Sequence, residues 1–203
     1  RSDGREIYAI VDGAVKVLDL NEQTVSRPLV EDVADFRIYG DKFVLFVTKP
    51  NGNKQSVGYV KKDYKQPRIV REVAYDGATQ AQFDVSKYYD KYYYLVSYGT
   101  EASLFSSSNM PDDSTSNLKL TYVKTLSLAH PITVVNMTDN GQFATVQDGS
   151  SFSTYNLEIS QLSSTDFDNG TAALPQELKY LDGYLLWGVR DAKLHTYEFD
   201  GAN

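Results

Sequence analysis

The segment VADFRIYGDKFVLFVTKPNGNKQSVGYVKKDYKQPRIVREV, residues 33–73, decides the fold. It divides into four runs rich in Val, Ile, Phe and Tyr, which are separated by stretches containing Gly, Asn or Pro. Short apolar or alternating runs bounded by such residues are typical of β-strands. We therefore predict four consecutive strands, at residues 33–40, 42–48, 55–62 and 67–73.

Tight-turn signals continue along the whole chain. Two-residue hairpin turns favour Asp-Gly and Asn-Gly pairs, because their central residues need a positive φ that Gly, Asn and Asp tolerate. The pairs are Asp12-Gly13, Asn51-Gly52, Asp76-Gly77, Asn140-Gly141, Asp148-Gly149, Asn169-Gly170, Asp182-Gly183 and Asp200-Gly201. No segment predicts a helix, and we expect the Ser- and Asp-rich stretch from Ser106 to Asn117 to be a long surface loop.

A pattern of a turn, an aromatic residue and an apolar strand recurs along the chain. It occurs in GDKFVLFVTK from Gly40, YDKYYYLVSY from Tyr89, DNGQFATVQD from Asp139, LDGYLLWGVR from Leu181 and, more weakly, DGREIYAIVD from Asp3. The aromatic residues are Tyr8, Phe43, Tyr92, Phe143 and Tyr184. Their spacing of roughly 35 to 50 residues brackets the period of propeller blades, which is about 40 to 50 residues.

The repeats predict an all-β chain, a β-propeller of four-stranded antiparallel blades with about five blades or part-blades. We expect one propeller domain or fragment over residues 1–203, with partial blades at both ends. Its repeats lie near 1–32, 33–75, 76–131, 132–175 and 176–203. For the second full repeat we predict strands at 77–89 and 91–98, a long loop, a strand at 118–126 and another from Pro131. For the third we predict strands at 133–139, 142–148 and 151–160 and a final one near 172–174; at the start, residues 6–12, 15–20 and 26–30 supply strands.

The second strand of each repeat is apolar on both faces, as expected for a strand packed between neighbouring blades. We therefore interpret Tyr92, Tyr93, Tyr94 and Trp187 as inter-blade packing. Three other tyrosines lie at strand ends, where loops open onto the propeller faces. We predict these, Tyr88, Tyr89 and Tyr98, as candidate ligand-binding residues, because amphipathic aromatic residues are favoured in contacts. An ordinary, partly exposed edge position is the alternative for them.

Two strand endings, VKVLDLNEQ at residues 15–23 and LHTYEFDGAN at 194–203, resemble the β-propeller repeats of bacterial TolB and WD40-like proteins. The Gly-His and Trp-Asp pairs of true WD40 blades are absent. The run YAIVDGAVKVLDL, residues 8–20, is also similar to the propeller region of some bacterial envelope proteins that carry PEGA domains. These resemblances imply a propeller fold and an extracytoplasmic setting.

The sequence offers little that supports catalysis. His130 precedes a proline and His195 lies in an alternating strand; neither accompanies a GxSxG turn. The Asp-box and arginine cluster of sialidases are not present, and we predict neither an enzyme nor a cofactor. Asp166, Asp168, Asn169 and Gly170 form the best of the weak calcium motifs, but we interpret them as an ordinary Asx-rich turn and predict no metal site.

Composition narrows the partners. The net charge of −7 and the isoelectric point near 4.8 argue against nucleic acid, which needs a field of Lys and Arg. No apolar run is long enough to span a bilayer, and there is no cysteine. Because the chain begins at Arg1 without Met, we expect it to be a piece of a longer protein.

These observations predict a non-catalytic binding module of a bacterial envelope or extracytoplasmic protein. It would recognise a protein, peptide or glycan through loops of a propeller face. A carbohydrate-active hydrolase and a purely structural spacer are the alternatives. Open blade edges would allow a homo-oligomer.

Overall fold

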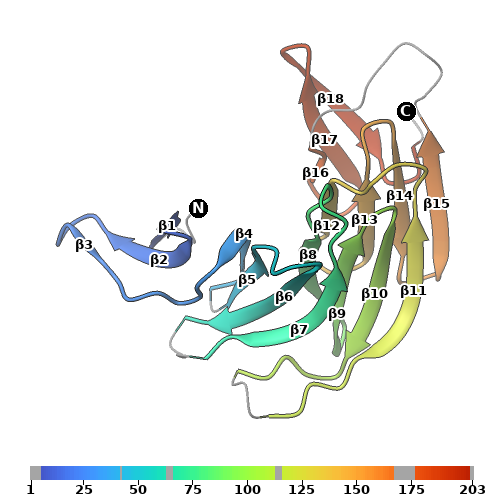
Figure 1. The fold of residues 1–203 in the computed structure, drawn as a ribbon. Helices are drawn as coiled ribbons and strands as arrows, with labels where there is room; N and C mark the ends of the chain where they lie inside the picture. The colour runs from blue at the N-terminus through green and yellow to red at the C-terminus, as the bar shows by residue number, and fades with distance from the viewer. Residues whose placement is uncertain (1–5, 42, 63–65, 113–115, 167–176, 202–203) are drawn as a thin grey trace. The chain divides into compact units, whose positions relative to one another are not determined.

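The fold is entirely β in the part of the chain that the structure describes. A computed structural model describes residues 6–41, 43–62, 66–112, 116–166 and 177–201. They contain eighteen strands in five antiparallel sheets of three or four strands (Figure 1). The predicted all-β class is therefore confirmed, and these residues include no helix of the length and apolarity that a membrane span requires.

The chain forms two compact units. The N-terminal unit comprises Arg1–Gly77 and Asn109–Lys119, and the C-terminal unit comprises Ala78–Ser108 and Leu120–Asn203. The short segment Asn109–Lys119 connects two strands of the C-terminal unit but packs within the N-terminal unit.

The N-terminal unit contains two sheets. One has the order β1 (Ile7–Val11), β2 (Ala14–Asp19) and β3 (Thr24–Val25); the other has the order β4 (Val33–Tyr39), β5 (Phe43–Thr48), β6 (Lys54–Lys61) and β7 (Arg68–Ala74). The four strands of the second sheet lie within two residues of the predicted positions, because their apolar runs and turns are both clear in the sequence.

The C-terminal unit contains three sheets, each in chain order or its reverse. The strands are β8 (Gln82–Tyr88), β9 (Lys91–Tyr98), β10 (Glu101–Ser107) and β11 (Thr121–Ser127), then β12 (Val134–Met137), β13 (Phe143–Gln147), β14 (Ser151–Asn156) and β15 (Gln161–Asp166), and finally β16 (Lys179–Tyr180), β17 (Leu185–Arg190) and β18 (Lys193–Glu198). The first strands of the three sheets are neighbours, with β12 beside both β8 and β16 (Figure 1).

Apolar side chains fill the space between neighbouring sheets. In the N-terminal unit the core comprises Tyr8, Val15, Val30, Val33, Phe36, Val44, Phe46 and Val60. Between the first two sheets of the C-terminal unit it comprises Leu95, Ala102, Leu104, Leu126, Ile132, Val135, Met137, Ala144, Val146 and Tyr155. Each core takes residues from both sheets, and second strands such as β5 and β13 are buried on both faces.

Polar side chains join the neighbouring first strands. The carboxylate of Asp84 on β8 accepts a 2.8 Å hydrogen bond from the backbone N–H of Met137 on β12. The hydroxyl of Ser86 donates to the carbonyl of Thr138 at 2.7 Å. Because these groups lie among packed strands, the bonds fix the register of one sheet against the next.

The second strands bury their aromatic residues unequally. Tyr94 is fully buried, whereas Tyr92, Tyr93 and Trp187 are only half-buried. Tyr184 immediately precedes β17 and is 58% exposed, so it does not share the burial of its counterparts Phe43 and Phe143.

One strand of the second full repeat was missed by the sequence analysis. The third strand is β10, Glu101–Ser107, and the predicted strand at 118–126 is instead the fourth strand, β11. Residues from Pro131 lead into β12 of the next sheet. The serines of β10 suggested a loop, but Ser106 and Ser107 are buried.

The predicted surface loop from Ser106 to Asn117 is also partly buried. Met110 and Pro111 are buried, and the hydroxyl of Tyr59 donates to the carbonyl of Pro111 at 2.9 Å. The ammonium group of Lys61 contacts the carboxylate of Asp112 at 2.7 Å. In the third repeat the fourth strand is β15, Gln161–Asp166, and the stretch predicted near 172–174 lies outside the described residues.

Candidate functional site

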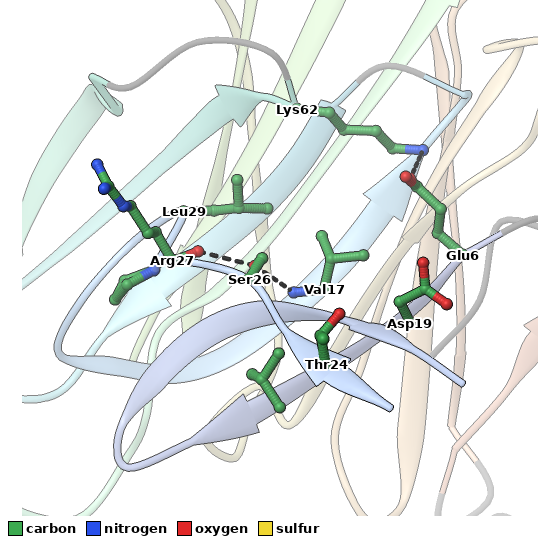
Figure 2. Close-up of a pocket in the computed structure, with 10 residues that line it drawn as sticks. Glu6, Val17, Asp19, Thr24, Ser26, Arg27, Leu29 and Lys62 are labelled. Carbon is green, nitrogen blue, oxygen red and sulfur yellow. Dashed lines mark hydrogen bonds and ion pairs between the residues drawn. The ribbon is translucent and has the colours of Figure 1, made fainter. Parts of the chain in front are cut away.

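The N-terminal unit contains a pocket with a volume of about 640 Å³. Its walls come from the end of β2, from β3 and the residues after it, and from two charged residues contributed by other segments (Figure 2). The lining residues are Glu6, Val17, Asp19, Thr24, Val25, Ser26, Arg27, Pro28, Leu29 and Lys62.

An interruption in the outer strand of the first sheet shapes this pocket. The backbone N–H of Ser26 bonds the carbonyl of Val17 at 2.9 Å, and pairing with β2 resumes where the N–H of Leu29 bonds the carbonyl of Val15 at 2.8 Å. Between them lie Arg27 and Pro28, and proline has no backbone N–H to donate. The predicted strand at 26–30 is therefore present only as separate pairings around this interruption.

A group of contacts holds the charged side of the pocket. The carboxylate of Glu6 lies 3.6 Å from the ammonium group of Lys62 and accepts a hydrogen bond from the hydroxyl of Tyr8. The Lys62 ammonium also lies 5.0 Å from the centre of the Tyr8 ring. Burial and the bond with Glu6 raise the pKa of Tyr8 to about 12, so this hydroxyl stays a donor at neutral pH.

Two other polar groups of the pocket, those of Asp19 and Ser26, support its own turns. The carboxylate of Asp19 accepts bonds from the backbone N–H groups of Asn21 and Glu22 at 2.9 and 3.0 Å. The hydroxyl of Ser26 accepts from the N–H of Val17 at 2.9 Å and donates to the carbonyl of Arg27 at 2.8 Å. These bonds stiffen the pocket before any ligand arrives.

The guanidinium of Arg27 differs from these groups. It is exposed and forms no hydrogen bond or ion pair with any described residue. Figure 2 shows it on the far side of Leu29 from the Glu6–Lys62 pair. Because Lys62 is paired with Glu6, Arg27 is the cation of the pocket that is available to a ligand.

The sequence does not predict this pocket, because the pattern of residues 26–30 indicates an ordinary strand. An Arg-Pro pair inside an expected outer strand is the only local signal, since proline removes a donor from the ladder. The approach of Glu6 and Lys62 depends on tertiary packing.

The structure brings two of the three predicted tyrosines together. Tyr88 ends β8 and Tyr89 begins the turn to β9; their ring centres are 4.5 Å apart. Tyr98 lies at the opposite end of β9, about 23 Å away along the strand. Tyr89 is 79% exposed and Tyr98 is 37% exposed. Because they lie at opposite ends of β9, Tyr98 belongs to a different end of the sheet.

The residues weighed for catalysis serve turns and pairing. The N–H of His130 bonds the carboxylate of Asp148 at 3.3 Å, and His195 is half-buried in β18. Burial alone would raise the pKa of Asp148, but hydrogen bonds from Ser150, Ser151 and His130 lower it below the usual value. Within the described ranges no three His, Asp or Glu side chains gather as a metal site would require; Asp168, Asn169 and Gly170 lie outside them.

Comparisons with known proteins define the fold. No family model matches the chain, and no curated protein matches it by sequence. A chain of the mitotic checkpoint complex is similar in structure, with a TM-score of 0.62 and 14% identity over 99% of this chain and 60% of that one. The β-propeller domain of Cps50 (Swd1) from Myceliophteria thermophila has a TM-score of 0.58 and 14% identity, over 96% of this chain and 62% of that one. TolB from Acinetobacter baumannii has a TM-score of 0.56 and 11% identity, over 98% of this chain and 50% of that one.

These likenesses, with the five antiparallel sheets, show that the chain has a β-propeller fold with partial blades. The chain spans 50–62% of the length of the three propellers. At 11–14% identity, they establish the fold alone. Function has to be argued from the sites.

Proposed function

We propose that this chain is a non-catalytic binding module that holds a segment of a partner protein or peptide in the pocket of the N-terminal unit. The observation that carries the proposal is the pocket itself, in which the charged side chains Glu6, Asp19 and Lys62 already have partners within the protein and Arg27 does not. Its volume of about 640 Å³ lies within the usual range for ligand sites, about 300–1,000 Å³.

The walls of the pocket favour an apolar group. Val17, Val25, Pro28 and Leu29 line it, and Val25 is 53% exposed without a ligand. Burying one aliphatic side chain of a partner contributes about 1.5–3 kcal/mol. This gain is large enough for a weak, reversible contact and needs further interactions to become specific.

Arg27 supplies the specific interaction. A guanidinium presents paired N–H donors that match the two oxygens of a carboxylate. A ligand with an apolar side chain and a nearby carboxylate would satisfy both parts of the pocket. A segment with an aliphatic residue beside Asp or Glu, or a C-terminal aliphatic residue, has this chemistry.

The experiment uses N-acetyl-leucine, with N-acetyl-leucinamide as the uncharged control. We expect the acid to shift the NMR signals of the Val17, Ser26 and Leu29 amides at millimolar concentration, with at least about fivefold higher affinity than the amide. Arg27→Gln should abolish the preference for the acid and leave folding unchanged. Equal binding of the acid and the amide, or no shift at these amides, contradicts the proposal.

A hydrolase on this scaffold would need two facing carboxyl groups, one with a raised pKa. The described carboxyl groups with a shifted pKa are Asp148 and Asp182, and both are lowered. In Asp182, hydrogen bonds from the backbone N–H groups of Tyr184 and Leu185 cause the shift. These carboxylates act as turn acceptors, so the geometry supports binding better than acid catalysis.

The proposal includes a setting outside the cytoplasm, in a bacterial envelope. The acidic isoelectric point near 4.8 and the resemblance of residues 15–23 to TolB-type repeats support it. Fractionation of cells that express the tagged full-length protein would test this setting. Recovery in the cytosol would contradict the proposed location and leave the binding site unaffected.

A further inference from the structure

We propose that one end of the C-terminal unit is a docking surface for an arginine-bearing segment of a partner protein, independent of the pocket in the N-terminal unit. The surface is formed by the β8–β9, β12–β13, β14–β15 and β16–β17 turns, and we call it the tyrosine end. Its prominent side chains are those of Tyr89, Ile159, Leu181 and Tyr184.

Large apolar side chains are unusually exposed there. Tyr89 is 79% exposed, Leu181 61%, Ile159 60% and Tyr184 58%. Single exposed apolar residues are ordinary, but a group of them on adjoining turns is typical of an interaction surface. Aromatic residues in particular contribute large contact areas at low entropic cost.

Close contacts between the turns make this one continuous surface. A Cβ placed on Gly141, in the β12–β13 turn, would lie 2.4 Å from the carbonyl oxygen of Lys87 and 2.7 Å from the nitrogen of Tyr88. In the β16–β17 turn, a Cβ placed on Gly183 would lie 3.6 Å from the side-chain amide nitrogen of Asn140. The β12–β13 turn therefore packs directly against both of the other turns.

The β14–β15 turn joins the same surface. The carboxylate of Glu158 accepts a 2.8 Å hydrogen bond from the side-chain amide of Gln142. Its charge also reaches Tyr88: burial, a hydrogen bond with Tyr89 and the negative charge of Glu158 raise the pKa of Tyr88 to about 12. Ile159 follows Glu158 directly in this turn and is exposed beside it.

The surface is held rigid before binding. The rings of Tyr88 and Tyr89 meet edge to face, and those of Phe143 and Tyr184 lie 5.7 Å apart. Asp182 accepts bonds from the N–H groups of Tyr184 and Leu185 at 2.8 and 2.9 Å. A rigid surface loses little conformational entropy when a partner docks.

The conformation of Tyr89 also suits an interaction role. It is the first of two residues in the turn between Tyr88 and Lys91, and its φ is 51°. In the next turn of the same sheet, the corresponding place is taken by Gly99, with a φ of 57°. An aromatic residue in this left-handed region is disfavoured, so the turn conformation by itself does not explain a tyrosine at this position.

Charge indicates the chemistry of the partner. The turns carry the exposed carboxylates Asp90, Asp139, Glu158 and Asp182, against the cations Lys87 and Lys91. A hollow of about 210 Å³ lies between Asp139 and Asp182, beside Leu181. Described residues make no bond to the carboxylate of Asp139 or to the second oxygen of Asp182. A guanidinium fits this hollow, because it pairs with carboxylates and stacks on tyrosine rings.

The test uses the whole chain and three blocked pentapeptides. Their sequences are glycine-X-leucine-X-glycine, with X as arginine, glutamine or glutamate. We expect the arginine peptide to shift the NMR signals of Tyr89, Asn140 and Tyr184 at low salt, with roughly tenfold higher affinity than the glutamine peptide and no binding of the glutamate peptide.

Variants distinguish the surface from a general charge effect. Tyr89→Gly removes the ring and places at this positive φ a residue that tolerates it, so the variant should fold normally. Its affinity for the arginine peptide should fall roughly tenfold. Asp139→Asn should lower the affinity for the arginine peptide several-fold, whereas Tyr98→Ala and Arg27→Gln should leave this affinity unchanged. Equal affinity of the arginine and glutamine peptides overturns the proposal, and so does unchanged binding in both Tyr89→Gly and Asp139→Asn. Because Arg27 affects only the pocket, failure here is separate from failure of the proposed function.

Discussion

The first sheets of the two units show how one structural difference creates a pocket. In both sheets, the carbonyl of a turn glycine accepts a backbone hydrogen bond from the segment that leads to the next sheet. The carbonyl of Gly13 accepts from the N–H of Val33 at 2.8 Å, and the carbonyl of Gly99 accepts from the N–H of Ile132 at 2.7 Å. The outer strand of the C-terminal example is β11, with seven residues, whereas that of the N-terminal example is β3, with two. A full outer strand closes the apolar core, and an interrupted one leaves a hollow beside it.

The largest expected difference comes from a matched pair of leucine substitutions. Leu104 is fully buried in the closed core, whereas Leu29 is half-buried beside the pocket. Leu104→Ala should lower the free energy of unfolding by about 3–5 kcal/mol, because it leaves a cavity. Leu29→Ala should cost about 1 kcal/mol, because its site is already open. Urea denaturation measures both, and equal losses would show that the two cores are equally closed.

The next effect concerns packing between turns. Gly141 has a φ of 74°, and an added Cβ would collide with the backbone of Lys87, so Gly141→Ala should cost about 2–3 kcal/mol. Gly149 has open space around its Cβ position, and Gly149→Ala should change stability by less than about 0.5 kcal/mol. Thermal unfolding of the two variants is the measurement, and a tolerated Gly141→Ala would mean that the turns are not in contact.

A smaller effect on stability is expected from Asp148, whose carboxylate accepts hydrogen bonds within a turn of the C-terminal unit. Asp148 is fully buried and accepts bonds from the N–H groups of Ser150 and Ser151, both at 2.7 Å. Because its folded-state pKa is lowered, it adds stability above the pKa of an unfolded aspartate, about 3.9, and loses it as pH falls through the folded pKa. Asp148→Asn should cost about 1–2 kcal/mol at pH 7.

Urea denaturation at pH 7 and pH 3 provides the control for that prediction. The difference between Asp148→Asn and the parent chain should shrink as the solution becomes more acidic. A difference that does not depend on pH would show that the charge of Asp148 is unimportant and that only its shape matters.

The smallest effect on stability is expected at β3, the short outer strand beside the pocket. Val25 is in β3 and is 53% exposed, so Val25→Ser should change the free energy of unfolding by less than about 0.5 kcal/mol. It should nevertheless weaken N-acetyl-leucine binding, because it removes an apolar wall of the pocket. If Val25→Ser destabilised the chain as strongly as a core substitution, the contrast between the two sheets would be wrong.

Local patterns predicted much of the fold and little of the pocket. The strands of residues 33–73 were predicted within two residues, because their apolar runs are bounded by strong turn formers. β10 was missed, since buried serines such as Ser106 look like loop residues when their partner strands are unknown. Tyr88 and Tyr89 are neighbours in the chain, so their proximity could be expected. The separation of Tyr98 follows from the direction of β9.

The alternation of apolar runs and sharp turns is a property of chain order, and it was sufficient to define an all-β chain of repeated four-stranded sheets. The approach of Glu6 to Lys62 and the meeting of four turns at the tyrosine end were decided only by the tertiary structure. Strand formation depends on neighbours within a few residues. A pocket or docking surface depends instead on contacts between segments distant in sequence, and no local pattern encodes those contacts.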